Sequence, residues 1–292
     1  MISLGPNTLN QKKLLKFNLY SVSKTLLTLL NIVFTRLLGK RLILPSKLAK
    51  GTEASAFIND VLSDEKNAIY LEIGVKKGST FEAVKSKVKV GVDPYPKYFS
   101  LNLRKLESWR CTSDNYFENH CNRLFDVIYL DGLHHFDQTW RDLQNSLRYI
   151  KPSGIILIDD IIPKDKFSGL TPQQFALESR FLSSGSSDSA WNGDIYKIGL
   201  LLSKLPENFV FRVIDFGYNP RAILLCSNYN WRSFPIFSSE IIKEADDALP
   251  ESLFDFQDSK VSIPELFRPI SAEEALRMAR NHMQGFGSKK ID

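Results

Sequence analysis

The 292-residue sequence is poor in the residues that build disulfide scaffolds and zinc sites. It has only three cysteines, Cys111, Cys121 and Cys226, and four histidines. No two cysteines form a Cys-x-x-Cys pair or stand at the spacing of a metal finger, which argues against a zinc-finger module and a disulfide-stapled small domain. A sparse, odd set of cysteines is typical of a reducing compartment, so we expect a cytoplasmic protein.

Long hydrophobic runs and N-terminal acidic residues are also missing. In the N-terminal region the longest uncharged stretch is 25–35, shorter than the ~20 residues of a membrane helix, and we see no small-residue cleavage site of a signal peptide. Residues 1–52 hold nine Lys or Arg and no Asp or Glu. The rest therefore carries 38 − 9 = 29 basic and 33 acidic side chains, a net charge of −4. Such a body does not suggest a nucleic-acid groove, and we expect no nucleic-acid partner.

Residues 11–45 show apolar side chains at intervals of three and four, which predicts an amphipathic helix with basic ends. Two interpretations stay open. The helix lies on an anionic membrane, as a peripheral contact at the inner membrane surface, or it packs on the rest of the chain or on a second copy in a homo-oligomer. We divide the chain into this basic helical extension (1–52), a main domain (53–230) and a C-terminal extension (231–292).

Short apolar runs alternate with helical stretches in the main domain. We expect strands at 68–73, 88–92, 109–112, 125–130, 154–158, 208–215 and 221–227. We expect helices at 53–63, near 78–86, near 97–107, at 137–149 and at 191–204, and in the extension at 271–283. This order predicts βαβ units, and so an α/β fold with a doubly wound, mostly parallel sheet of seven strands. Residues 163–190 lack this rhythm, and a long segment of that kind beside a site is typical of a lid.

Acidic residues end two of the predicted strands. Asp131 follows the run at 125–130, with His134 and His135 directly after it, and Asp159 and Asp160 follow the run at 154–158. The carboxyl ends of parallel strands meet at one edge of a sheet, so Asp131, Asp159 and Asp160 should converge there with His134. Three carboxylates repel each other unless a cation lies among them. The pattern therefore predicts a site for a divalent metal.

A glycine turn follows the first predicted strand. Glu72 ends that strand, Gly74 and Gly78 bracket the turn into a helix, and Asp93 follows at the end of the second strand. Glycines here allow a close approach of the backbone to a ligand, and an acid at the position of Asp93 commonly binds ribose hydroxyls. The turn is not a G-x-G-x-x-G, and Glu72 would repel a pyrophosphate but suits a cationic adenosyl ligand. After the third strand, Ser113 and Asp114 either meet an adenine edge or form a helix-capping turn.

The segments Glu72-Ile73-Gly74, Gly91-Val92-Asp93 and Asp131-Gly132-Leu133-His134, together with Asp159-Asp160, resemble a class I S-adenosylmethionine-dependent methyltransferase. They resemble more closely the metal-dependent sugar O-methyltransferases of macrolide biosynthesis, over about residues 66–205. The resemblance implies a Rossmann-like methyltransferase fold. It implies that Asp131, Asp159 and Asp160 bind Mg²⁺ and that His134 is the general base. The predicted cofactor-binding residues are Glu72, Gly74, Gly78, Asp93, Ser113, Asp114 and Asp131.

We therefore expect a Mg²⁺-assisted O-methyltransferase that acts on a sugar or another polyhydroxylated small molecule. A histidine of near-neutral pKa can take the proton of a hydroxyl that the metal has acidified. Three alternatives remain: a metal-independent methyltransferase, a non-catalytic binding module associated with the membrane, and a nicotinamide oxidoreductase. The last is disfavoured because no Tyr-x-x-x-Lys follows the glycine turn.

Overall fold

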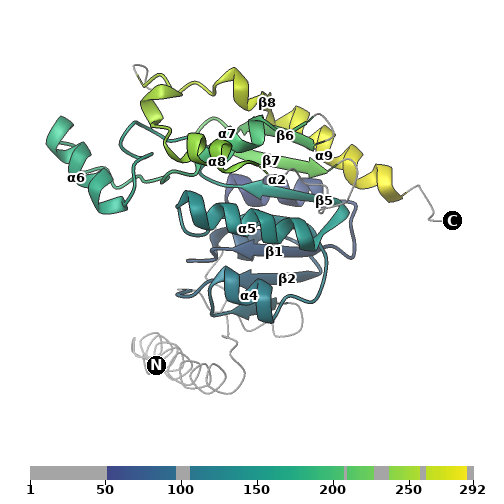
Figure 1. Ribbon diagram of the computed structural model, residues 1–292. Helices are drawn as coiled ribbons and strands as arrows, with labels where there is room; N and C mark the ends of the chain where they lie inside the picture. Colours follow the sequence, from purple (N-terminus) through teal and green to yellow (C-terminus); the bar gives the residue numbers. More distant parts are fainter. Residues whose placement is uncertain (1–50, 97–105, 207–208, 227–236, 257–260, 288–292) are drawn as a thin grey trace, which may run out of the picture.

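The computed structural model describes residues 51–96, 106–206, 209–226, 237–256 and 261–287 (Figure 1). The helix expected at 11–45 and nearly all of that expected near 97–107 lie outside these residues. So do the membrane and oligomer contacts expected of residues 11–45. Among the described residues, no helix is both long and apolar enough to span a bilayer.

One mixed sheet organises the described residues, in the order β3-β2-β1-β4-β5-β7-β6-β8 (Figure 1). Its strands are β1 (Ile69–Ile73), β2 (Val88–Val92), β3 (Leu106–Trp109), β4 (Phe125–Leu130), β5 (Ile150–Ile158), β6 (Phe209–Asp215), β7 (Arg221–Cys226) and β8 (Pro269–Ser271). Strands β1 to β5 pair in parallel, and β7 is antiparallel to both of its neighbours. The order reverses between β1 and β4, which creates a switch point at their carboxyl ends.

Helices cover both faces of the sheet. They are α2 (Glu53–Val61), α3 (Ser79–Ala83), α4 (Ser113–Asn119), α5 (Phe136–Tyr149), α6 (Gln173–Ser184), α7 (Tyr196–Ser203), α8 (Ser239–Asp246) and α9 (Ala272–Gly287). Buried side chains of α4, α5, α7 and α8 share one apolar core with the sheet, and those of α2, α3 and α9 share the other. This arrangement confirms the predicted doubly wound, mostly parallel α/β fold.

The C-terminal extension adds an eighth strand to the seven expected. Strand β8 pairs in parallel with β6, and the helix expected at 271–283 is present as α9. The Ser271 hydroxyl accepts a hydrogen bond from the Glu274 N–H at 3.2 Å, as a helix N-cap does. Helix α9 buries Ala275, Ala279 and Met283 on the face of the sheet that α2 also covers. Residues 261–287 therefore belong to the same core as the main domain.

Several segments differ from the sequence expectation. Strand β5 begins at Ile150 instead of residue 154. Strand β3 begins at Leu106 instead of residue 109. Residues 163–190, expected to lack regular structure, contain the 12-residue helix α6. Helix α7 begins at Tyr196 instead of residue 191, because Gly193 has a φ of +65° and residues 191–194 form a loop. That loop contacts the acidic strand ends described next.

Candidate functional site

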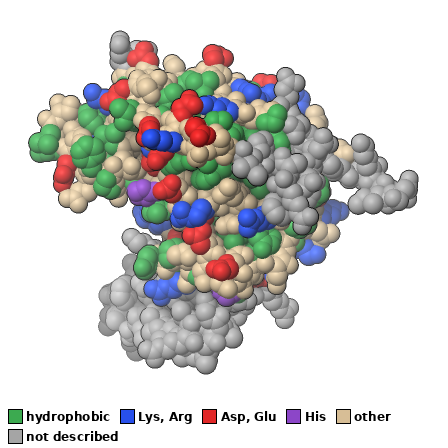
Figure 2. Space-filling view, viewed as in Figure 1, with side chains coloured by type: hydrophobic (Ala, Val, Ile, Leu, Met, Phe, Trp, Pro, Cys, Tyr) green, Lys and Arg blue, Asp and Glu red, His purple; other side chains and the backbone are tan. Residues whose placement is uncertain are grey.

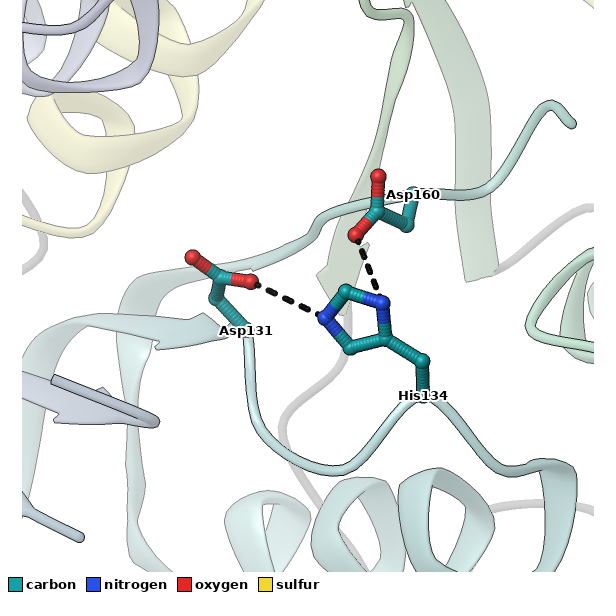
Figure 3. Close-up of side chains that lie close together, drawn as sticks. All are labelled: Asp131, His134 and Asp160. Atoms are coloured by element: carbon teal, nitrogen blue, oxygen red, sulfur yellow. Dashed lines mark ion pairs between the residues drawn. The ribbon is translucent and has the colours of Figure 1, made fainter. Parts of the chain in front are cut away.

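The side chains of Asp131, His134 and Asp160 meet at the switch-point edge of the sheet (Figure 3). Asp131 follows β4 directly, and Asp160 lies two residues beyond β5. The imidazole of His134 lies between them, with Nε2 3.7 Å from Asp131 Oδ1 and Nδ1 3.2 Å from Asp160 Oδ2. One ligand atom from each residue lies within 4.8 Å of the other two. The structure therefore brings together three of the four side chains expected at this edge.

Electrostatics couple these three groups. Burial and the charge of Asp159 raise the pKa of Asp131 to about 6 and that of Asp160 to about 7. Burial alone would lower the pKa of His134, but its hydrogen bond to Asp131 and the charges of Asp160 and Asp131 raise that pKa to about 9. The carboxylates thus stabilise positive charge at the position of the imidazole.

Asp159, the fourth expected member, is engaged elsewhere. Its Oδ2 accepts a hydrogen bond from the Tyr129 hydroxyl at 2.5 Å. Its Oδ1 lies 2.9 Å from Nε of Arg221 and accepts a hydrogen bond from Asn219 Nδ2 at 3.0 Å. A buried arginine already balances this charge, although Asp159 still lines the same small pocket as the other three members.

A four-residue loop, Trp191 to Asp194, holds the site from the other side. The Trp191 ring stacks on the His134 ring with centroids 5.3 Å apart, and Asn192 Nδ2 donates to Asp160 Oδ1 at 2.7 Å. A Cβ at Gly193 would lie 1.7 Å from the His134 carbonyl oxygen, so only glycine fits there. This loop lies within the stretch, about residues 66–205, over which the sequence resembles methyltransferases, and its Asn-Gly pair is a turn signal.

Asp194 completes the loop by capping α5. Its Oδ1 accepts a hydrogen bond from the Phe136 N–H at 2.7 Å, at the start of that helix. A strand-ending aspartate is often only the cap of the next helix, but here a residue 58 positions along the chain supplies the cap. Asp131 is therefore free of the capping role and available to a ligand.

The predicted cofactor residues lie around the end of β1. Gly74 has a φ of +93°, and a Cβ there would lie 1.8 Å from the Asp131 carbonyl oxygen. Gly78 has a φ of +77° and precedes α3. Asp93 accepts hydrogen bonds from the backbone N–H of Lys76 at 2.7 Å and of Tyr95 at 2.6 Å, so it orders the glycine turn. Its contact with a ribose remains a prediction.

Glu72 lies deeper than the turn. It is 2% exposed, and its Oε2 accepts a hydrogen bond from the Tyr70 hydroxyl at 2.6 Å. Burial raises the pKa of Glu72 well above its ordinary value, and the charges of Asp131 and Asp159 add to that. The protonated form that this favours is neutral, and a cationic ligand would restore the carboxylate.

Ser113 and Asp114 begin α4, next to a buried carboxyl of α5. Thr112 is the N-cap of α4, accepting a hydrogen bond from the Asn115 N–H at 3.3 Å, so neither Ser113 nor Asp114 supplies it. Gln138 Nε2 donates to Ser113 Oγ at 3.1 Å and to Oδ1 of Asp142 at 3.0 Å. An adenine contact of Ser113 or Asp114 remains a prediction.

Asp142 makes stability depend on pH. Burial raises its pKa from 3.8 to about 6. The folded state then binds its proton more tightly than the unfolded chain, so stability falls as pH rises from about 4 to about 6. Over this pH range, we expect the free energy of unfolding of Asp142→Asn to fall by about 1–2 kcal/mol less than that of wild type. Urea unfolding at pH 4.5 and 7.5 measures the difference, with exposed Asp137→Asn as control. An equal pH response of Asp142→Asn and wild type would contradict this assignment.

A cavity of about 430 Å³ opens beside Asp160. Polar groups of Asp160, Lys164, Asn192 and Asn219 line it, with the rings of Trp191 and Tyr218 and the apolar side chains of Ile162, Pro163, Ala190, Pro220 and Val261. This volume lies in the range of small-molecule sites. The cavity is therefore large enough for a small molecule, and it borders Asp160 at the acidic strand ends.

Comparison with known proteins agrees with this geometry. Residues 71–161 match the family model of a methyltransferase domain, a segment that runs from β1 to just past β5. No curated protein sequence matches the chain. Similar solved structures include a putative O-methyltransferase from Klebsiella pneumoniae, with 11% identity over 63% of this chain and 84% of that one, and a TM-score of 0.43. An O-methyltransferase from Bacillus cereus shows 14% identity over 68% of this chain and 88% of that one, with a TM-score of 0.41. These likenesses are too distant to assign a substrate.

The matched segment lies within the doubly wound, Rossmann-like sheet, from β1 to just past β5. The chain therefore carries a segment similar to a methyltransferase domain over residues 71–161. The match includes the glycine turn, Asp131, His134 and Asp160, so the residues that converge in space lie within the methyltransferase domain.

Proposed function

We propose that this protein transfers a methyl group from S-adenosylmethionine to a hydroxyl oxygen of a sugar or another polyhydroxylated small molecule, assisted by a divalent metal, Mg²⁺ or a close relative. The observation that carries the proposal is the group of Asp131, His134 and Asp160 next to the 430 Å³ cavity. A cytoplasmic location, with peripheral contact at the inner membrane surface through residues 11–45, belongs to the same proposal.

The donor set fits a divalent metal. Asp131 and Asp160 offer the carboxylate oxygens that Mg²⁺ prefers, and an imidazole beside them would also suit Mn²⁺. Asp159 lines the same small pocket, but Arg221, Asn219 and Tyr129 already occupy most of its acceptor positions. A divalent cation held there would acidify a bound hydroxyl and favour the neutral form of His134.

The chain's own residues supply the rest of the chemistry. The His134 ring, held by stacking on Trp191 and by the contact of its Nδ1 with the Trp191 carbonyl at 3.1 Å, directs Nε2 toward Asp131. From there Nε2 takes the proton of the acceptor hydroxyl as the oxygen attacks the methyl group. Trp191 and Tyr218 offer flat surfaces to the C–H groups of a sugar, and the amides of Asn192 and Asn219 can bind its hydroxyls. Most of the rate enhancement then comes from holding the acceptor hydroxyl and the methyl donor in the right relative position.

Removing the metal tests the proposal. We expect formation of S-adenosylhomocysteine, with a panel of sugars and polyols as acceptors, to fall at least about tenfold in EDTA and to return with Mg²⁺ or Mn²⁺. Calorimetry with S-adenosylmethionine in EDTA is the control, because the glycine turn contains none of the residues proposed to hold the metal. Full activity in EDTA would overturn the metal assignment. It would favour the second candidate, a metal-independent methyltransferase in which His134 alone neutralises Asp131 and Asp160.

A further inference from the structure

Residues 163–190 leave the site after Asp160 and return to it at Trp191, and they carry helix α6, which lies at the outside of the molecule (Figure 1). This helix has little apolar packing. Its buried residues are Ala176 and Arg180, whereas Phe175, Phe181 and Leu182 are 53%, 59% and 84% exposed. Apolar side chains accordingly gather on the surface where α6 lies (Figure 2). Hydrophobic burial therefore contributes little to holding α6 in place.

Arg180 supplies the attachment that apolar packing does not. It is 2% exposed, and its guanidinium makes a two-point contact with Asp165, with Nε 3.0 Å from Oδ2 and Nη2 2.9 Å from Oδ1. Nη1 also donates to the Asp188 carbonyl at 2.7 Å, and Nη2 to the Ala190 carbonyl at 2.8 Å. One planar group thus joins the start of the segment, its helix and its end. Lysine, a point charge, could not make this set of contacts.

From Asp165 the hydrogen bonds continue to the site. Asp165 Oδ1 accepts from the backbone N–H of Ser168 at 2.7 Å. The Ser168 carbonyl then accepts from the N–H groups of Asn192 at 3.0 Å and of Gly193 at 2.9 Å. Asn192 in turn holds Asp160. Arg180 is therefore connected to the acidic strand ends through a continuous set of buried or partly buried contacts.

We infer that Arg180 is a positioning residue: with Asp165 it fixes residues 188–192, so that Trp191 and Asn192 stay against His134 and Asp160. In this arrangement residues 163–190 form a fixed wall of the cavity, in contrast to the lid that the sequence suggested. Lys164 and Ala190, near the two ends of that segment, both line the cavity. The consequence for methyl transfer rests on the proposed function, but the fixing of the loop does not.

Hydrogen exchange and metal binding test this role. For Arg180→Gln we expect the amides of Asn192 and Gly193 to exchange at least about tenfold faster than in wild type, since their acceptor is no longer held. We expect Mn²⁺ affinity, measured by calorimetry, to fall about tenfold, with S-adenosylmethionine affinity unchanged. Arg180→Lys should recover only part of both effects. Glu178→Gln, an exposed position on the same helix, is the matched control.

The outcomes separate this inference from the proposed function. Unchanged exchange at Asn192 and Gly193 in folded Arg180→Gln would overturn the inference. Should Arg180→Gln fail to fold, Asp165→Asn decides, because its amide oxygen still accepts from Ser168 while the charged pair is lost; unchanged exchange there also overturns it. If wild type binds no Mn²⁺, the metal part of the proposed function fails, and exchange alone decides the role of Arg180.

Discussion

Replacing His134 with alanine is expected to lower methyl transfer by about 100- to 10,000-fold, the range that a general base contributes. The two carboxylates raise the pKa of the His134 imidazole to about 9, so it acts as a base once a bound cation favours its neutral form. Initial rates of S-adenosylhomocysteine formation with a saturating acceptor measure the effect. Binding of S-adenosylmethionine should stay close to wild type, because His134 does not touch the glycine turn.

His135 provides the matched control for this substitution. It is the adjacent residue, stands at the N-cap position before α5, and contacts the same Trp191 ring edge-on at 5.7 Å. It makes no ion pair with either carboxylate among the described contacts. We expect His135→Ala to change the rate by less than about tenfold, a barrier change below about 1.4 kcal/mol. Equal losses from the two variants would mean that the loop, and not the imidazole of His134, determines activity.

Replacing Gly74 with alanine is expected to weaken S-adenosylmethionine binding by at least about 100-fold, or about 2.7 kcal/mol. The Cβ would lie 1.8 Å from the Asp131 carbonyl oxygen, and the neighbouring carbonyl carbon is only 2.4 Å away. Both contacts are with backbone, so no side chain can rotate to make room. The ends of β1 and β4 would have to separate, although Asp131 N–H donates to the Ile73 carbonyl at 2.9 Å. Isothermal titration with S-adenosylmethionine measures the loss.

Gly185 separates this steric effect from ordinary backbone strain. It also has a positive φ, +69°, but no atom lies within 4 Å of a Cβ built there. Gly185→Ala should therefore cost only the roughly 1–2 kcal/mol of a left-handed residue, seen in thermal unfolding, and leave cofactor binding intact. A Gly74→Ala variant that binds S-adenosylmethionine as well as Gly185→Ala does would contradict the close-packed switch point.

Much of the fold follows from local pattern. Short apolar runs predicted β1, β2 and β4 within one residue, because buried parallel strands are apolar on both faces. The convergence of Asp131, His134 and Asp160 followed from topology, since parallel strands share one carboxyl edge. No distance needed to be known for that prediction, only the alternation of strands and helices.

Long-range pairing is what the sequence could not show. The sequence shows Asp159 as a candidate ligand but does not show that Arg221, 62 positions later, pairs with it. The cap of α5 comes from Asp194, and the attachment of α6 depends on Arg180, a charged residue that no apolar periodicity would mark as buried. These contacts join side chains whose proximity is decided only once the sheet has formed.

The pairing of β8 with β6 has a practical consequence for anyone who shortens this gene. Ending the reading frame at residue 230, where the sequence suggests a boundary, would strip a neighbour from β6 and uncover the apolar surface beneath α9. Exposed edge strands pair between molecules and cause aggregation. We therefore expect such a fragment to accumulate in inclusion bodies. A purification handle or fusion partner at this end of the chain should therefore be added after residue 287, so that β8 and α9 are kept.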